Sequence, residues 1–280
     1  MSGRLCTIDL REIRSHLIEL NQDLLDHVKI IAEEAGQAIL SIYQQDEFEV
    51  HTKSDQSPLT KADLASHDII TKALKKLTPK IPILSEEGDK LEVDIETFWC
   101  VDPLDGTKEF IKRNGEFTVN IALIEKYQPV LGVIHIPVTN ETFLAMKGNG
   151  AKKIKDHQMQ YLSKQQNQTR QPLIFAVSRS HLNQQTKDFI QQYKAETIGV
   201  GSSIKLTMLA EGLADAYPRF GPTSLWDMAA GHAILRETGG EIYTLDQQSL
   251  VYNVLKKLNP DLIAVRDKDR QFIVEEKHES

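Results

Sequence analysis

The sequence predicts a layered α/β protein with two lobes, on three observations. Two helix-period segments open the chain and short strand-like segments follow them, which is typical of an α+β lobe. After residue 170, strand-like and helix-like segments alternate, which indicates helices packed on a sheet. The 280 residues suffice for one large domain or for two lobes that share a core, and we place the boundary between residues 150 and 151.

The N-terminal lobe, residues 1–150, begins with two amphipathic helices. Apolar residues recur at helical spacing from Leu24 to Ile42, and a second such pattern runs from Thr60 to Leu77 and stops at Pro79. Short apolar segments bounded by turn residues then predict strands. These strands are Ile81–Leu84, Thr97–Val101, Phe117–Glu125, Val130–Val138 and Thr142–Met146, with turns at Tyr127–Pro129 and Gly148–Gly150.

The C-terminal lobe, residues 151–280, opens with a polar stretch from Lys152 to Arg170 that is rich in Gln and Lys. It fits an exposed hairpin or loop, or the seam between the lobes. Gly239-Gly240 is a strong stop signal for the last helix of this lobe. The predicted strands are Leu173–Val177, Thr197–Val200 and Ala214–Tyr217, and the predicted helices are Leu182–Tyr193, Ser202–Glu211 and Trp226–Thr238.

The composition is that of an ordinary globular protein. Hydrophobic residues make up 40% and charged residues 26%, and the net charge of -7 argues against nucleic acid as the main partner. No apolar run approaches the roughly 20 residues that a spanning helix needs, and Met1 to Asn21 lacks a signal-peptide core. Cys6 and Cys100 are too few for a disulfide framework or a cysteine zinc site. We expect a cytoplasmic protein without a transmembrane segment; peripheral association with the inner membrane and the oligomeric state stay open.

A strand-ending turn at residues 102–107, with the sequence DPLDGT, carries two acids three residues apart. Pro103 has no N–H to donate to a ladder, and Gly106 permits a backbone conformation that other residues resist. The turn can therefore aim Asp102 and Asp105 at one point, with the Leu104 carbonyl between them. Oxygen ligands of this kind suit Mg²⁺ or Mn²⁺ rather than zinc. The alternative is a turn whose aspartates only cap the following helix.

Further acids lie at strand ends or helix starts. Glu86 and Glu87 follow the strand that ends at Leu84, while Asp63 and Asp227 stand at the starts of predicted helices. Each of these, taken alone, is more commonly a solvated turn or a helix cap. In layered α/β structures, however, such ends line the ligand crevice. The acids can therefore converge, although spacing alone does not prove that they do.

Two segments resemble the paired signature of the inositol monophosphatase superfamily. They are DPLDGT at residues 102–107 and WDMAAG at residues 226–231, and they follow the Ser57 to Asp63 segment and the Glu86-Glu87 pair in the order of that superfamily. The resemblance covers roughly Asp23 to Ala264. It implies the layered αβαβα fold of sugar phosphatases and a magnesium-dependent, lithium-sensitive phosphatase.

The resemblance also implies the metal ligands. Glu86, Asp102 and Asp105 would hold the first metal position, with the Leu104 carbonyl assisting, and Asp227 would complete a second. We expect two or three Mg²⁺ ions in each active site, with Mn²⁺ as a substitute.

The same resemblance implies the catalytic pair. Asp63 and Thr107 would orient and deprotonate the attacking water. Glu87, next to Glu86, would contact the metal ligands and would not bind the metal itself.

Other segments are similar to the CysQ branch of the superfamily. They are GTKEF at residues 106–110, VSRSH at 177–181, GSSIK at 201–205 and YPRFGPTS at 217–224. This branch removes the 3′-phosphate from 3′-phosphoadenosine 5′-phosphate, so the resemblance implies a nucleotidase that releases AMP and phosphate and supports sulfur assimilation. The chain departs from close relatives at Leu225, where Glu is common, and at Ser85, where Gly is frequent.

A small-molecule nucleotide with two phosphates needs contacts that an inositol phosphate does not. Cations in the C-terminal lobe would select the second phosphate, and a helix start there would add N–H and hydroxyl donors. Ordinary solvated charges are the alternative for Lys205 and Arg219. The residues that we assign to substrate binding are Gly106, Thr107, His181, Ser202, Lys205 and Arg219.

Two other functions stay open at this point. One is an inositol monophosphatase or a fructose-1,6-bisphosphatase-like enzyme with the same metal machinery. The other is a non-catalytic nucleotide sensor that keeps the fold. Loss of Asp63 or Thr107 would favour the sensor, and both residues are present.

Overall fold

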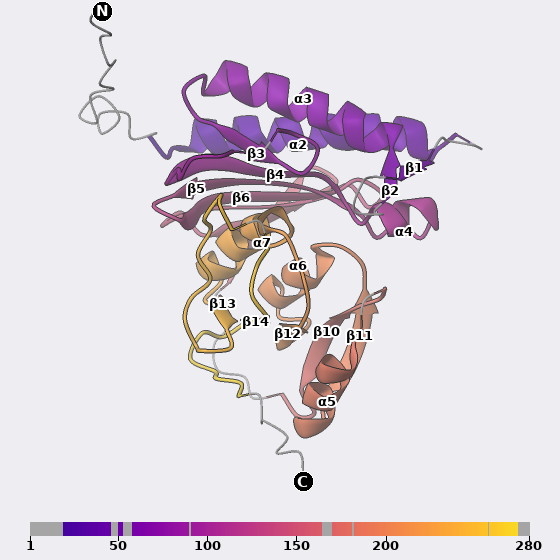
Figure 1. Cartoon of the computed structure of the whole chain (residues 1–280), viewed down its shortest axis with the longest axis vertical. Helices are drawn as coiled ribbons and strands as arrows, with labels where there is room; N and C mark the ends of the chain where they lie inside the picture. The colour runs from indigo at the N-terminus through magenta and orange to yellow at the C-terminus, as the bar shows by residue number, and fades with distance from the viewer. Residues whose placement is uncertain are drawn as a thin grey trace, which may run out of the picture.

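The structure is a computed structural model that describes residues 19–45, 50–52, 58–89, 91–163, 170–180, 182–256 and 258–273. In these ranges the chain forms layers in the order helices, sheet, helices, sheet, helix (Figure 1). Clusters of buried apolar side chains lie between the layers. The predicted layered αβαβα arrangement is therefore confirmed.

The outer layer on the N-terminal side consists of helices α2 (Gln22–Tyr43) and α3 (Lys61–Leu77). Both predicted helices are confirmed, and a side chain caps each of them. The Asn21 side chain accepts a hydrogen bond from the Leu24 N–H at 2.9 Å, and Thr60 caps α3. The buried stripe of α2 includes Val28, Ala32, Ala35 and Ile39.

The large sheet joins seven strands of the described chain in the order β3-β4-β5-β6-β7-β8-β9. The pair β3–β4 is parallel, and the other neighbours are antiparallel. All five strands predicted for the N-terminal lobe are present, with shifted ends. The strands are β3 (Ile83–Ser85), β4 (Thr97–Asp105), β5 (Thr118–Glu125), β6 (Gln128–Ile136), β7 (Glu141–Met146), β8 (Ala151–Lys155) and β9 (Gln158–Leu162).

The large sheet differs from the prediction in the length of β4. We expected this strand to end at Val101, but it continues to Asp105. The ladder to β5 shifts between Asp102 and Asp105, so that β4 carries one residue more than its partner there. Such a bulge lets the strand pass Pro103, which has no N–H to donate.

The polar stretch after residue 151 forms the hairpin β8–β9, one of the alternatives that we expected for it. This hairpin pairs with β7 and so belongs to the large sheet. The large sheet therefore crosses the predicted boundary between residues 150 and 151, and the division of the chain into lobes stays a prediction.

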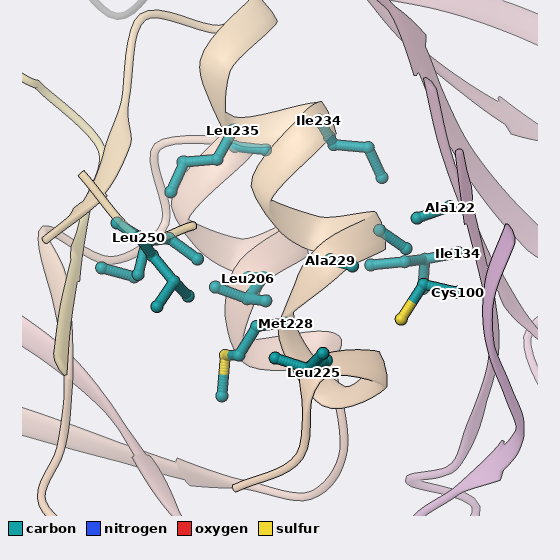
Figure 2. Packing of buried hydrophobic residues seen from close by; sticks show 14 of the residues in the cluster. Cys100, Ala122, Ile134, Leu206, Leu225, Met228, Ala229, Ile234, Leu235 and Leu250 are labelled. Carbon is teal, nitrogen blue, oxygen red and sulfur yellow. The ribbon is translucent and has the colours of Figure 1, made fainter. Parts of the chain in front are cut away.

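The middle layer consists of α6 (Ile204–Ala210) and α7 (Leu225–Glu237). Figure 2 shows α7 between the sheet side chains, such as Cys100 and Ile134, and the side chains of Leu206 and Leu250. The two helices touch at Gly231, where an added Cβ would lie 2.2 Å from a Leu206 methyl carbon. We expected α6 to begin at Ser202, but that residue has a φ of 47°, which is outside the helical region.

The small sheet has the order β11-β10-β12-β14-β13 within the described residues, and α5 (Gln184–Gln192) covers its outer face. Phe189 of α5 packs there against Phe175 and Phe272. The predicted alternation of strands and helices is confirmed, but β13 and β14 were not predicted. The strands are β10 (Ile174–Ser178), β11 (Glu196–Val200), β12 (Ala216–Arg219), β13 (Glu241–Thr244) and β14 (Leu262–Val265).

Short elements complete the fold near the N-terminal end of α3. Strands β1 (Val50–Thr52) and β2 (Pro58–Thr60) form an antiparallel pair, and α4 (Thr107–Ile111) follows β4 directly. Of the helices in the described ranges, none combines the length and the apolar character that crossing a bilayer requires.

Candidate active site

A cavity of about 300 Å³ opens where β4, α4, α6, β12 and α7 meet. Most of the site residues that the sequence predicted lie on its wall. His181 lies outside the described residues, and Asp63 stands behind Thr107. The predicted residues on the wall are Glu86, Asp102, Leu104, Asp105, Gly106, Thr107, Ser202, Lys205, Arg219 and Asp227.

Three carboxylates converge in this cavity. One oxygen from each of Asp102, Asp105 and Asp227 lies within 4.8 Å of the other two. Removal from water raises the pKa of Asp102 well above its ordinary value, and the negative charge of Glu86 raises it further. Desolvation, followed by the charge of Asp105, raises the pKa of Asp227 to about 8. The acids are therefore held close together at an electrostatic cost.

The bulge in β4 places the first two of these acids. The Asp102 carboxylate accepts a hydrogen bond from the Leu104 N–H at 3.1 Å, which tightens the turn. Gly106 ends the turn with a φ of 94°, a left-handed conformation in which a Cβ would lie 2.9 Å from a backbone oxygen. From the opposite side, the buried Ser66 hydroxyl of α3 donates to the Pro103 carbonyl at 2.7 Å.

Asp63 has two tasks at the start of α3. Its Oδ2 accepts hydrogen bonds from the N–H and the hydroxyl of Thr60, at 2.7 and 2.6 Å, and so completes a capping box. Its Oδ1 lies 3.1 Å from the hydroxyl of Thr107, which is the first residue of α4. The capping alternative is thus correct for one oxygen, while the other faces the site.

Asp227 repeats this arrangement at the start of α7. Its Oδ2 accepts a hydrogen bond from the Ser224 N–H at 2.8 Å, again within a capping box. The cap holds the carboxylate at the start of the helix, close to Asp105 of β4. A residue that looks like an ordinary N-cap in the sequence can therefore also be a site residue.

The turn after β3 brings Glu86 to the cavity. The Glu86 N–H donates to the Val101 carbonyl at 3.1 Å, so the turn continues the pairing of β3 with β4. The buried Ser85 hydroxyl lies 2.9 Å from Nδ1 of His67 on α3. Ser85 thus ties the acidic turn to the helix that carries Asp63.

Lys205 is not a solvated charge. Its side chain is 5% exposed, and its ammonium donates to the Ser202 and Val200 carbonyls and lies 5.2 Å from the Tyr217 ring centroid. Desolvation lowers its pKa to about 8, against the attraction of Asp105. Arg219 is half-buried on the same wall and donates to the Pro222 carbonyl at 2.9 Å.

Sequence reasoning missed two polar residues that contact the acids. The Ser203 hydroxyl and the Asn120 amide both reach Oδ2 of Asp105. A signal for Asn120 exists in the sequence, since Thr118 and Asn120 are alternate polar residues in an otherwise apolar strand. On β5 this alternation puts both on the face toward the cavity.

A family model for the inositol monophosphatase family matches residues 20–273. The chain belongs to this family. The 3′(2′),5′-bisphosphate nucleotidase CysQ of Escherichia coli strain K12 is 44% identical over 243 residues, which cover 85% of this chain and 97% of that protein. The CysQ of Haemophilus influenzae is 35% identical over 258 residues, 90% of this chain and 96% of that protein.

Solved structures of the inositol monophosphatase family share the fold. The crystal structure of CysQ from Bacteroides thetaiotaomicron has a TM-score of 0.77 and 41% identity, and the match covers 89% of this chain and 98% of that one. An inositol monophosphatase from Thermotoga maritima has a TM-score of 0.74 at 22% identity, covering 88% and 92%, which supports the fold alone. The family resemblance seen in the sequence is confirmed.

Proposed function

We propose that this chain is a magnesium-dependent bisphosphate nucleotidase that converts 3′-phosphoadenosine 5′-phosphate to AMP and phosphate. Curated relatives at 44% identity carry the name of that activity. The observation that carries the proposal is one cavity in which the carboxylate cluster lies beside the buried cation Lys205. Such a cavity offers one place for the phosphate that is cleaved and another for the phosphate that is kept. A role in sulfur assimilation in the cytoplasm and sensitivity to lithium belong to the same proposal.

The carboxylate cluster suits magnesium. Its donors are all oxygens, which Mg²⁺ and Mn²⁺ prefer. Two unit charges about 4 Å apart repel by about 4 kcal/mol at an effective dielectric constant of 20, so the cluster favours a bound cation. Bound Mg²⁺ would neutralise charge on the phosphate and on the leaving oxygen and would lower the pKa of a water. The ligands that we propose for two or three ions are Glu86, Asp102, Asp105, the Leu104 carbonyl and Asp227.

Thr107 and Asp63 are placed to handle the proton of the attacking water. When the Thr107 hydroxyl donates to Oδ1 of Asp63, its lone pairs remain able to accept a hydrogen bond from water. A proton can then pass from the water to Thr107 while the Thr107 proton moves toward Asp63. Oδ2 of Asp63, fixed by Thr60, keeps the carboxylate in the required orientation.

The second phosphate would lie near Lys205, Arg219 and Ser202. Ser202 supports this assignment because its hydroxyl is buried on the cavity wall without a hydrogen-bond partner in the described part of the chain. A buried hydroxyl without a partner is costly, and a ligand oxygen would satisfy it. Gly106 and Thr107 would contact the phosphate that is cleaved, and the role of His181 stays a prediction.

The proposal is tested by kcat/KM for three substrates in saturating Mg²⁺: 3′-phosphoadenosine 5′-phosphate, inositol 1-phosphate and fructose 1,6-bisphosphate. We expect the nucleotide to be preferred. Preference for either of the other two would replace the nucleotidase with the sugar or inositol phosphatase. Tight nucleotide binding without turnover of any substrate would favour the sensor. Adding LiCl to the same assay tests lithium inhibition.

Removing the cations should affect the bisphosphate substrate selectively. We expect Lys205→Met and Arg219→Ala each to lower kcat/KM for 3′-phosphoadenosine 5′-phosphate by roughly 10–150-fold, since a hydrogen bond to a charged group contributes about 1.5–3 kcal/mol. Turnover of inositol 1-phosphate, which lacks the second phosphate, should change little. Lys187→Ala, on the exposed face of α5, is the control. Equal losses on both substrates would mean that these cations serve the acids or the fold.

The metal-free protein should lose stability as the pH rises. The folded pKa of Asp227 is about 8, above the ordinary 3.8, so the folded state holds the proton more tightly than the unfolded state does. The stabilisation is complete below about pH 4 and is lost as the pH rises through about 8. In EDTA we expect Tm to fall by at least about 5 °C between pH 5 and pH 9, since 1 kcal/mol corresponds to about 2–4 °C at this size.

Two comparisons check that this fall comes from the acid cluster. Asp227→Asn should flatten the Tm profile, and saturating Mg²⁺ should raise Tm more at pH 8 than at pH 5. An Asp227→Asn profile as steep as that of the wild type would show that other groups cause the fall.

A further inference from the structure

We propose that Ser203 and Asn120 are positioning residues that hold Asp105 in place to bind metal. The inference deepens the proposed function, because it rests on the metal site proposed above. It concerns two side chains of this protein that touch a carboxylate of the cluster and that lie outside the paired signature at residues 102–107 and 226–231.

Both side chains converge on the same oxygen of Asp105. The Ser203 hydroxyl donates to Oδ2 at 2.7 Å, and Nδ2 of Asn120 donates to Oδ2 at 3.2 Å. Nδ2 of Asn120 also donates to the Ser203 hydroxyl oxygen at 2.8 Å. Because Asn120 supplies a proton to that oxygen, the single proton of the hydroxyl is directed away from Asn120 and toward the carboxylate, the strongest acceptor nearby.

The Asn120 amide is itself fixed from behind. The Thr118 hydroxyl donates to Oδ1 of Asn120 at 2.9 Å, so the amide must present its nitrogen to Asp105 and Ser203. Thr118 and Asn120 lie two residues apart on β5, and β4 pairs with them through Asp105 and Asp102. All of this lies in the interior, since Asn120 and Thr118 are 1% or less exposed. The amide therefore has little freedom to turn, and the large sheet sets its direction.

Ser203 also reaches the other side of the cluster. Its hydroxyl lies 3.0 Å from the backbone carbonyl of Asp227, at the start of α7. One side chain thus spans Asp105, from β4, and Asp227, from a helix more than a hundred residues later in the chain. Because the hydroxyl has one proton and that proton goes to Asp105, the Asp227 carbonyl is a close neighbour of Ser203 and not a second partner of the same hydrogen bond. What Ser203 holds in place is therefore the Asp105 carboxylate.

Loss of this network should weaken metal binding more than folding. Residues that orient a ligand typically contribute about 10–100-fold to metal affinity when they are removed. The fold has other support at this point, because α6 and α7 also pack through Leu206 and Gly231. A hydroxyl that only filled space would leave metal affinity unchanged.

The experiment is a titration of the full chain with Mn²⁺, without substrate, in which electron paramagnetic resonance measures the free ion. We expect Ser203→Ala and Asn120→Ala each to raise the Kd for Mn²⁺ by about 10–100-fold. The double variant should lose less than the product of the single losses, because the two side chains form one network. Circular dichroism of each metal-free variant reports whether the fold is kept.

Thr207→Val is the matched control. Thr207 lies on α6, the helix for which Ser203 is the N-cap residue, and it is 2% exposed. Its hydroxyl donates to the Ile204 carbonyl and not to an acid. Its Kd should equal that of the wild type. As a second readout, the activity of Ser203→Ala should approach the wild-type value when Mg²⁺ is raised to saturation.

Wild-type Mn²⁺ affinity in Ser203→Ala and Asn120→Ala would overturn the inference, and so would an equal loss in Thr207→Val. If Ser203→Ala does not fold, Asn120→Ala decides alone. A wild-type protein that binds Mn²⁺ but does not hydrolyse 3′-phosphoadenosine 5′-phosphate would contradict the nucleotidase proposal and leave this inference standing. A wild-type protein that binds no Mn²⁺ would overturn both.

Discussion

Asp105→Asn should abolish phosphate release while leaving the fold intact. Asp105 lies in the carboxylate cluster with Asp102 and Asp227, and removal from water already raises its pKa. The amide keeps the shape of the side chain but has no charge to attract a cation. We expect a loss of turnover larger than the roughly 10–100-fold that is typical when a residue that hydrogen-bonds to a metal ligand is removed.

The measurement is kcat for 3′-phosphoadenosine 5′-phosphate over a wide range of Mg²⁺ concentration. Asp26→Asn, the same chemical change on the exposed face of α2, should behave as the wild type. Near-normal turnover of Asp105→Asn in saturating Mg²⁺ would remove Asp105 from the proposed ligand set.

Asp105→Asn should also show how the carboxylate cluster affects the stability of the metal-free protein. Ionisation of Asp105 is disfavoured in the folded protein, in spite of the attraction of Lys205 and the hydrogen bonds from Ser203 and Asn120. Replacing the carboxylate with a neutral amide removes this penalty. The melting temperature in EDTA at neutral pH should therefore stay equal or rise, while the increase that Mg²⁺ produces should shrink.

The layers of the fold could be predicted from the sequence because their patterns are local. The apolar stripes of α2 and α3 repeat at helical spacing over many residues, and the alternation after residue 170 is equally clear. β13 and β14 were not predicted, and their pairing with each other and with β12 joins segments that no local pattern connects. The hairpin β8–β9 was ambiguous because a polar edge strand looks like a loop in the sequence.

The site was predictable to the extent that its acids stand at element ends. Asp63 and Asp227 each use one oxygen to cap a helix. An aspartate at a helix start therefore fitted both a simple cap and a site residue, and the sequence could not separate the two roles. Local patterns did not reveal that Asp102, Asp105 and Asp227 meet; motif resemblance and then the structure did.

Ser203 and Asn120 show the limit of sequence reasoning here. Both are ordinary polar residues whose role depends on the distance to a carboxylate on another element. Lys205 illustrates the same limit, since its burial against the Tyr217 ring could not be told from a solvated charge in the sequence. Contacts between distant segments arise from the packing of layers, which no local pattern encodes.

Asp63→Asn and Thr107→Ala should lower kcat with little change in KM. The two side chains are hydrogen-bonded at 3.1 Å, and the proposed role of the pair is to take the proton of the attacking water. That role acts on the chemical step and not on substrate binding. Losses of roughly 10²–10⁴-fold are typical when a general base is removed.

The pair should also behave as one unit. Without Asp63, the Thr107 hydroxyl loses its proton acceptor, and without Thr107 the Asp63 carboxylate loses its contact with the water. The double variant should therefore be only slightly slower than the worse single variant, as expected for groups that act together. Asp68→Asn, on the exposed face of the same helix, is the matched control and should keep wild-type kcat.

The measurement is kcat and KM for 3′-phosphoadenosine 5′-phosphate in saturating Mg²⁺, with Tm recorded for each variant. Tm is needed because Asp63 also caps α3, and loss of a cap costs about 0.5–2 kcal/mol on its own. Thr107→Ala does not touch that cap, so it separates catalysis from stability. A rise in KM at unchanged kcat for Thr107→Ala would assign the hydroxyl to substrate binding and would leave the proton of the water without its proposed acceptor.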